Sequence, residues 1–116
     1  MKTHITAIRV FKDPFLGTRH IRLRGYIAPD WFPFWVNIHI NYPDGRKPRI
    51  GPTPTLPGGS WQSLPMLVPI EGVYEFIAQC SLIPPHLFEI PLGPPDTIRV
   101  DTIGREDKDF VPIEEG

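Results

Sequence analysis

Apolar and polar side chains alternate along three segments of the chain, and a period of two predicts β-strands. In Thr18–Ile27 one parity is apolar and the other is basic or polar. Phe34–Tyr42 and Val73–Leu82 show the same alternation. The residues expected to face inward in these segments are Ile21, Leu23, Gly25, Ile27, Phe34, Val36, Ile38, Ile40, Tyr42, Tyr74, Phe76, Ala78, Cys80 and Leu82. Strands with one apolar face are typical of an antiparallel sheet.

A weaker strand pattern precedes these segments. In Ile5–Lys12 the alternation directs Ile8 and Val10 inward. Ile5 falls out of phase with them, and an extra residue inserted between the two parts of the strand would restore the alternation. We therefore expect the first strand to contain a β-bulge.

Two further strands are predicted near the middle and the end of the chain. Leu64–Ile70 places Leu64, Met66, Val68 and Ile70 on one side. Its prolines cannot donate to a sheet ladder, which favours an edge position. Asp96–Ile103 is expected to direct Ile98 and Val100 inward.

Proline and glycine are frequent, with 16 and 10 residues in a chain of 116. Proline ends helices and glycine weakens them, so long helices are not expected. Gly51–Gly59 is predicted as an extended crossover and Ser81–Pro95 as a long loop. These features predict an all-β, Greek-key β-sandwich of about seven antiparallel strands. We expect one domain over residues 1–103, followed by a flexible or docking tail over residues 104–116.

The segment Gly72-Val73-Tyr74-Glu75-Phe76 resembles the turn into strand F of immunoglobulin-like domains. That superfamily includes fibronectin type III domains and disulfide-free bacterial and phage domains. The resemblance implies that the Tyr74 hydroxyl bonds to the chain just upstream, as a tyrosine corner. It also implies that Phe76 and Leu23 occupy the positions of the two disulfide cysteines. Domains of this superfamily mostly serve recognition and assembly, so the resemblance implies a role other than catalysis.

Charge is distributed unevenly although the net charge is only −1. Residues 1–60 have a net charge of +6 and residues 61–116 have a net charge of −7. Basic and acidic strands would pair across the surface if they lay side by side. Alternatively, a polar molecule of this kind would stack head to tail with copies of itself, or bind an anionic partner.

The sequence predicts no catalytic, cofactor or metal site. The four histidines, His4, His20, His39 and His86, show no metal-binding spacing. Cys80 is expected to be buried and unreactive, and as the single cysteine it allows no intrachain disulfide. No apolar leader follows Met1, and no apolar run is long enough to cross a membrane. We therefore expect a protein made in the cytoplasm, without a membrane partner, that a virion could incorporate.

Three groups of apolar residues are candidates for interaction sites. Tryptophans at the surface stack on sugars or form hot spots in protein interfaces, and the chain has Trp31, Trp35 and Trp61. The predicted loop at residues 83–95 contains Leu87, Phe88, Ile90 and Leu92. The tail contains Phe110, Val111 and Ile113. The loop and the tail would pack either on their own domain or on a neighbouring subunit.

These patterns favour a non-enzymatic structural, assembly or protein-interaction module, such as a decoration, tail or capsid-associated component of a phage or virus particle. The expected partner is another copy of the chain or a repetitive protein lattice. The alternative is a carbohydrate-binding module that uses the tryptophans. Nucleic acid is the less favoured partner, although the first half of the chain could form a basic stripe. An OB-fold, which binds single strands of nucleic acid, usually has a helix between its third and fourth strands, and the corresponding part of this sequence shows none. The residues of that stripe would be Arg9, Arg19, Arg22, Arg24, Arg46, Lys47 and Arg49.

Overall fold

The computed structural model describes residues 2–29, 34–48, 50–82 and 90–113, which form nine β-strands and no helix. The strands are β1 (Lys2–Lys12), β2 (Arg19–Ala28), β3 (Trp35–Asn41), β4 (Thr53–Pro54), β5 (Ser60–Gln62), β6 (Met66–Leu67), β7 (Val73–Ser81), β8 (Pro91–Asp101) and β9 (Val111–Pro112). No helix able to span a membrane occurs in this part of the chain.

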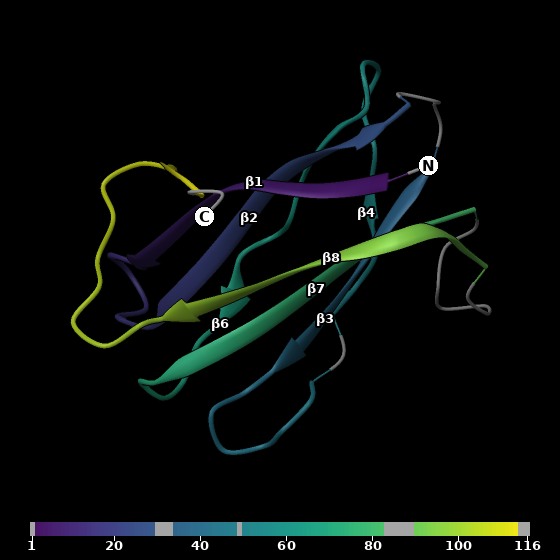
Figure 1. Cartoon of the computed structure of the whole chain (residues 1–116). Helices are drawn as coiled ribbons and strands as arrows, with labels where there is room; N and C mark the ends of the chain where they lie inside the picture. The colour runs from purple at the N-terminus through teal and green to yellow at the C-terminus, as the bar shows by residue number, and fades with distance from the viewer. Residues whose placement is uncertain (1, 30–33, 49, 83–89, 114–116) are drawn as a thin grey trace.

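The strands form two antiparallel sheets that pack against each other (Figure 1). The first sheet has the order β5-β2-β1-β9, with β6 also paired to β2, and the second has the order β4-β3-β7-β8. Apolar residues from both sheets form one core, as Val10, Leu23, Val36 and Phe76 illustrate with no exposed surface. The predicted all-β fold with antiparallel strands and a core between two sheets is therefore confirmed.

The bulge expected in β1 is present. Ile5 pairs with Gly25 and Ala7 pairs with Arg24, so the register shifts by one residue between them. This shift allows Ile5 and Ile8 to be buried on the same face although their sequence parity differs.

Two hydrogen bonds join the sheets directly. The hydroxyl oxygen of Thr3 on β1 accepts a bond from the backbone N–H of Cys80 on β7, at 2.8 Å. The carboxylate of Asp96 on β8 accepts a bond from the backbone N–H of Ile5, at 2.7 Å. Ile5 lies at the bulge, in a part of β1 that does not pair with β9. The Asp96 carboxylate therefore supplies the acceptor for the Ile5 N–H group.

Several predicted strand boundaries are wrong. Leu64 was expected to face inward but is 72% exposed, because regular pairing in this segment is limited to β6. Leu82 was also expected inward but is 48% exposed and follows the last residue of β7. Pro91–Pro95 was expected in a loop but belongs to β8. β8 is an edge strand, so the missing N–H groups of its prolines need no partner on the open side.

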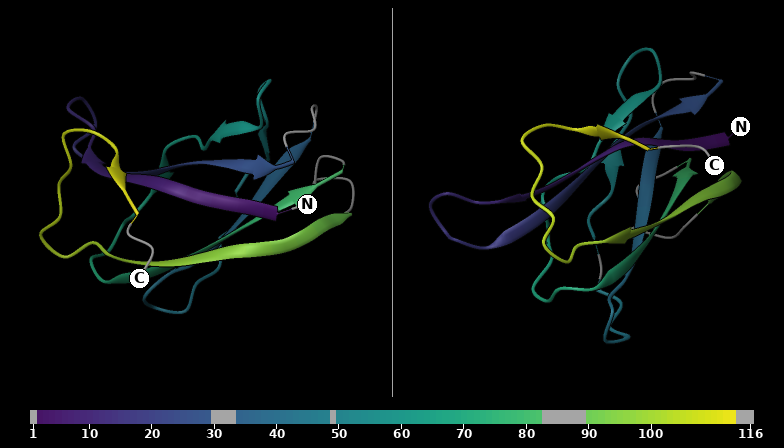
Figure 2. Two further views of the ribbon diagram at one scale, coloured as in Figure 1. Left: turned by 45° about the horizontal axis from the view of Figure 1, so that its top comes forward. Right: turned by 60° about the vertical axis from the view of Figure 1, so that its left-hand side comes forward.

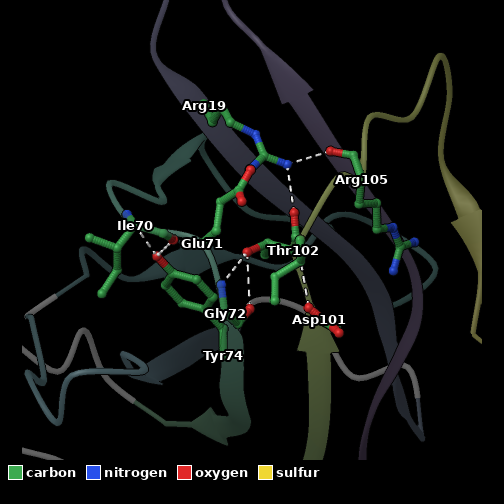
Figure 3. A network of polar contacts seen from close by, with 9 residues as sticks. Arg19, Ile70, Glu71, Gly72, Tyr74, Asp101, Thr102 and Arg105 are labelled. Atoms are coloured by element: carbon green, nitrogen blue, oxygen red, sulfur yellow. Dashed lines mark hydrogen bonds and ion pairs between the residues drawn. The ribbon is translucent and has the colours of Figure 1, made fainter.

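The hydrogen bond expected for the Tyr74 hydroxyl is present at the start of β7 (Figure 3). The hydroxyl of Tyr74 donates a hydrogen bond to the carbonyl of Ile70, at 2.6 Å. The Tyr74 ring is completely buried, as are Phe76 and Leu23. Gly72 has a φ of 149°, and a Cβ atom there would lie 2.8 Å from the Pro43 ring, which explains the glycine at this turn.

A polar network connects three segments of the chain near Tyr74 (Figure 3). The Thr102 hydroxyl donates to the carbonyl of Gly72 at 3.0 Å and accepts from its N–H at 3.1 Å. The guanidinium of Arg19 donates to the carbonyl oxygens of Thr102 and Arg105 and forms an ion pair with Glu71 at 3.1 Å. The start of β2 is thereby connected to the turn before β7 and to the segment after β8.

The described part of the tail, residues 104–113, packs on its own domain. β9 pairs with Ala7 and Ile8 of β1. Further along the same edge, Asp107 accepts a bond from the N–H of Val10 through its carboxylate at 2.9 Å and donates its own N–H to the Val10 carbonyl at 2.6 Å. Residues 104–113 therefore contact β1 of the same chain.

Candidate functional site

The first sheet is basic. β1 and β2 contain no Asp or Glu, and β5, β6 and β9 contain no charged residue. The Lys and Arg residues of β1 and β2 are Lys2, Arg9, Lys12, Arg19, Arg22 and Arg24. The second sheet contains Arg99 and three carboxylates. Basic and acidic strands therefore do not pair side by side; the two signs of charge are largely segregated between the two sheets.

Arg9 and Arg22 lie directly opposite each other in the β1–β2 ladder. Like charges in this position destabilise a sheet. Within the described residues, no carboxylate forms an ion pair with Arg9, Arg22 or Arg24. This cluster of positive charge is therefore not explained by pairing within the fold.

Neutral groups hold these guanidinium groups in place. Arg22 donates through Nε to the carbonyl of Ser63 at 3.0 Å. With the amide of Gln62 oriented so that its oxygen faces Arg22, this oxygen accepts from the two Nη atoms of Arg22 at 2.7 and 3.1 Å. The guanidinium carbon of Arg9 lies 4.7 Å from the centre of the Phe11 ring. That of Arg24 lies 3.9 Å from the centre of the Phe110 ring. Such cation–π contacts orient an arginine without neutralising it.

Two aromatic pairs complete this surface. The rings of His4 and Tyr26 are stacked with their centres 4.5 Å apart, and those of Phe11 and His20 are stacked at 5.8 Å. Tyr26 remains 41% exposed. We call this surface the basic face, and it comprises His4, Arg9, Phe11, His20, Arg22, Arg24, Tyr26 and Phe110.

The turn between β1 and β2 presents two apolar side chains to solvent. Phe15 is 94% exposed and Leu16 is 73% exposed, the largest values among the large apolar side chains of the described residues. Figure 2 shows this turn projecting from one end of the sandwich. We call Phe15 and Leu16 the apolar tip.

The apolar tip stands on a turn with fixed geometry. The carboxylate of Asp13 accepts hydrogen bonds from the N–H groups of Phe15 at 2.8 Å and Leu16 at 2.9 Å. These bonds, to Leu16 first and Phe15 second, lower the pKa of Asp13. Backbone bonds from Asp13 to Thr18 and from Gly17 to Asp13 close the turn, at 2.8 and 2.9 Å. The turn thus holds both apolar side chains outward without help from the rest of the molecule.

The predicted tryptophan surface is not assembled. Trp61 was expected at the surface but is only 1% exposed, because it lies in β5 opposite Gly25 and its ring fills the space above that glycine. Trp35 is partly buried in the second sheet, where it pairs with Ser81 and Pro54. Trp31 lies outside the described residues. Trp35 and Trp61 therefore cannot form one platform for a sugar.

Some polar side chains of β3 form contacts within the domain. Asn37 is only 7% exposed, and its Nδ2 atom lies 3.0 Å from Nε2 of His39. Asn41 donates to the Glu75 carboxylate at 2.7 Å. These contacts use part of the hydrogen-bonding capacity of the β3 side chains within the domain.

The candidate apolar residues of the loop and the tail are partly used by the fold. Leu92 and Ile113 are partly buried and pack against the core. Ile90 and Phe110 are partly buried, and Val111 is 40% exposed. Leu87 and Phe88 lie outside the described residues.

No metal or nucleophile site emerges in the described part of the chain. Its histidines, cysteine and carboxylates form no group of three that could hold a metal ion. His20 lies in β2 and His39 in β3, which belong to different sheets. Cys80 is completely buried as predicted, and burial raises the pKa of its thiol. A protonated, inaccessible thiol is a poor nucleophile.

The sequence does not predict the apolar tip, and its basic stripe contains Arg9, Arg22 and Arg24 together with residues outside the basic face. A Pro-Phe-Leu-Gly sequence within a turn was the available signal for the tip. For the basic face, the signal was the absence of acidic residues from two adjacent strands. Comparison with protein-family models, with curated protein sequences and with solved structures gives no match.

Proposed function

We propose that this chain is a non-enzymatic assembly module that uses its apolar tip to bind a second copy of itself. The observation that carries this proposal is the exposure of Phe15 and Leu16 on a turn fixed by Asp13. Because the turn is ordered without a partner, binding costs little further conformational entropy. Burying a phenylalanine or leucine side chain stabilises a complex by about 1.5–3 kcal/mol.

Two features favour another copy as the partner. Leu64 and Leu67, which are 72% and 46% exposed beside the edge of the first sheet, offer an apolar surface for the tip of a neighbour. The charge of the second sheet is opposite in sign to that of the first. Copies stacked with unlike sheets facing would attract each other. A repeated contact of this kind suits a component of a phage or virus particle.

We further propose that the sandwich is of the immunoglobulin-like, Greek-key type. In immunoglobulin domains strands A and B are neighbours in one sheet, and strands C, F and G are neighbours in the other. The pairing of β1 with β2, and of β3 with β7 and β8, follows the same order. The hydrogen bond from Tyr74 to Ile70 at the start of β7 supports the same assignment.

Solution mass as a function of protein concentration tests the proposed function. We expect the unmodified chain to associate as its concentration rises in light-scattering or sedimentation measurements. The double variant Phe15→Ser, Leu16→Ser should associate roughly tenfold or more weakly. Leu56→Ser is the matched control, because Leu56 is 56% exposed in a different turn.

Two results would count against the proposal. One is a chain that remains monomeric up to millimolar concentration. The other is an association that Leu56→Ser weakens as much as the double variant does, because the contact would then not be located at the tip.

A further inference from the structure

We infer that the basic face binds a single strand of nucleic acid, with its arginines on the phosphates and Tyr26 against a base. This inference does not use the apolar tip, although it uses the same basic face of the first sheet that would meet the acidic sheet of a stacked copy. The sequence alone disfavours nucleic acid, because the helix typical of an OB-fold is missing between the third and fourth predicted strands. The β1–β2 register, however, places Arg9 of the expected basic stripe directly opposite Arg22.

The first argument is electrostatic. Arg9, Arg22 and Arg24 have no acidic partner within the described residues, and two of them oppose each other across the ladder. The contacts that these arginines make within the fold, including the bond from Arg9 Nε to the carbonyl of Asp107 at 3.4 Å, are to neutral groups. A chain of phosphates would neutralise the positive charge and release its own counterions. Basic side chains spaced about 7 Å apart, at every second residue of a strand, can follow an extended anion.

The second argument is preorganisation. Arg9 lies over Phe11, Arg24 lies over Phe110 and Arg22 is held by Ser63, so the three guanidinium groups are oriented before any ligand arrives. Each contact leaves the positive charge intact. Arginine is also suited to phosphate because its planar group can donate two parallel hydrogen bonds.

The third argument is the position of Tyr26. It follows Arg22 and Arg24 on the same side of β2, and its ring is 41% exposed. His4 stacks on the ring and thereby fixes its orientation. An exposed ring in line with basic side chains is the combination by which proteins bind single strands with little sequence preference. Unpaired bases can stack on such a ring, whereas the bases of a duplex are already stacked.

Fluorescence anisotropy of a labelled oligothymidine of about 20 nucleotides tests the inference. If the three arginines each contact one phosphate, the logarithm of the affinity should fall against that of the salt concentration with a slope of about −2. Binding should then weaken about 20-fold between about 50 and about 200 mM salt.

Variants separate charge from stacking. The double variant Arg22→Gln, Arg24→Gln should reduce the salt slope to about −0.7 and weaken binding at least about tenfold at low salt. Tyr26→Ala should weaken binding by about 5-fold or more while it leaves the salt slope unchanged. Arg99→Gln is the matched control, because Arg99 is a strongly exposed arginine of the second sheet. Near-ultraviolet circular dichroism would show that each variant keeps the native fold.

Three outcomes would overturn the inference. The first is no binding at low salt. The second is an equal loss of affinity in Arg99→Gln and in the double variant, which would indicate unspecific attraction to the whole molecule. The third is an unchanged affinity in Tyr26→Ala, because the basic face would then bind through charge alone. A duplex of the same length that binds as tightly as the single strand would have the same meaning. The tip variant Phe15→Ser, Leu16→Ser should bind the oligonucleotide normally, so the two proposals can fail separately.

Discussion

Replacement of Gly25 by alanine should destabilise the fold severely. Gly25 lies in the middle of β2, between β1 and β5, where it pairs with Ile5 at the bulge and with Trp61. A Cβ atom at this position would lie 2.0 Å from the carbonyl oxygen of His4 and 2.4 Å from the Trp61 ring. Neither distance is compatible with van der Waals contact, so the surrounding structure must move.

The cost follows from what would have to move. The first obstacle is backbone, and its displacement would open the β1–β2 ladder at the bulge. The second is the ring of Trp61, which is 1% exposed and would have to leave the core. Overpacking typically costs about 1–3 kcal/mol. Loss of a buried tryptophan side chain costs about 3–5 kcal/mol. We therefore expect Gly25→Ala to lower the free energy of unfolding by at least about 3 kcal/mol, against a typical total of about 5–15 kcal/mol.

Urea unfolding, followed by tryptophan fluorescence, would measure this loss. The midpoint should fall while the slope against urea stays the same. Gly51→Ala is the matched control, because a Cβ atom at Gly51 meets nothing within 4 Å and the residue needs no positive φ. It should be neutral or slightly stabilising. The reasoning would be refuted if Gly25→Ala stayed within about 1 kcal/mol of the unmodified chain. Trp61→Phe should not rescue Gly25→Ala, because the contact with the His4 carbonyl remains.

Three further predictions concern other parts of the fold. Thr102→Val removes both hydroxyl bonds to Gly72 and should cost about 1–3 kcal/mol in thermal or urea unfolding. Thr102→Ser keeps the hydroxyl and should cost less, so equal losses would contradict the role given to these bonds. Cys80 should react with a thiol reagent only as fast as the chain unfolds, and rapid labelling of the native protein in a colorimetric assay would disprove its burial. Truncation after Ile103 removes the β1–β9 pairing and four further hydrogen bonds to β1, and should cost at least about 3 kcal/mol in urea unfolding, whereas a truncated chain of unchanged stability would show that the tail contributes nothing.

The sequence predicts the long strands well because each has one buried and one solvated face. That alternation identified β2, β3 and β7, and the phase break at Ile5 identified the bulge in β1. The hydrogen bond from Tyr74 to the chain just upstream could be predicted because Gly72 and Tyr74 stand in a short local pattern. Such features depend on residues close together in the chain, so they can be predicted from the sequence.

Local reasoning fails where a residue's environment comes from distant segments. Trp61 lies in a strand of three residues, which is too short to show alternation, and its burial depends on the space above Gly25. The first part of β8 is rich in proline and resembles a loop, but Pro91 and Leu92 pair with Ser81 and Cys80 of β7. Pro94 and Pro95 lie where the register shifts between Leu92 and Asp96, so the ladder needs no N–H group from them. Without these tertiary contacts, Trp61 was mistaken for a surface residue and Pro91–Pro95 for part of a loop.

The two candidate surfaces illustrate the same limit. The sequence places Phe15 and Leu16 in a turn, but a turn can fold back on its domain or project from it. It also shows that β1 and β2 are basic, but only the register places Arg9 opposite Arg22. Exposure and cross-strand neighbours are properties of the assembled sheets.

The position of β1 has a consequence for synthesis. Ile5 bonds to Asp96 and Val10 bonds to Asp107, so these contacts join residues 91 and 97 positions apart. The residues of β1 therefore cannot form these contacts until Asp96 and Asp107 have been synthesised. On the ribosome, β1 and β2 would emerge as an apolar hairpin with an uncovered inner face, exposed for as long as the intervening segment takes to translate. Their basic outer face and the mid-strand Gly25 would help to keep such a nascent hairpin from pairing with its neighbours.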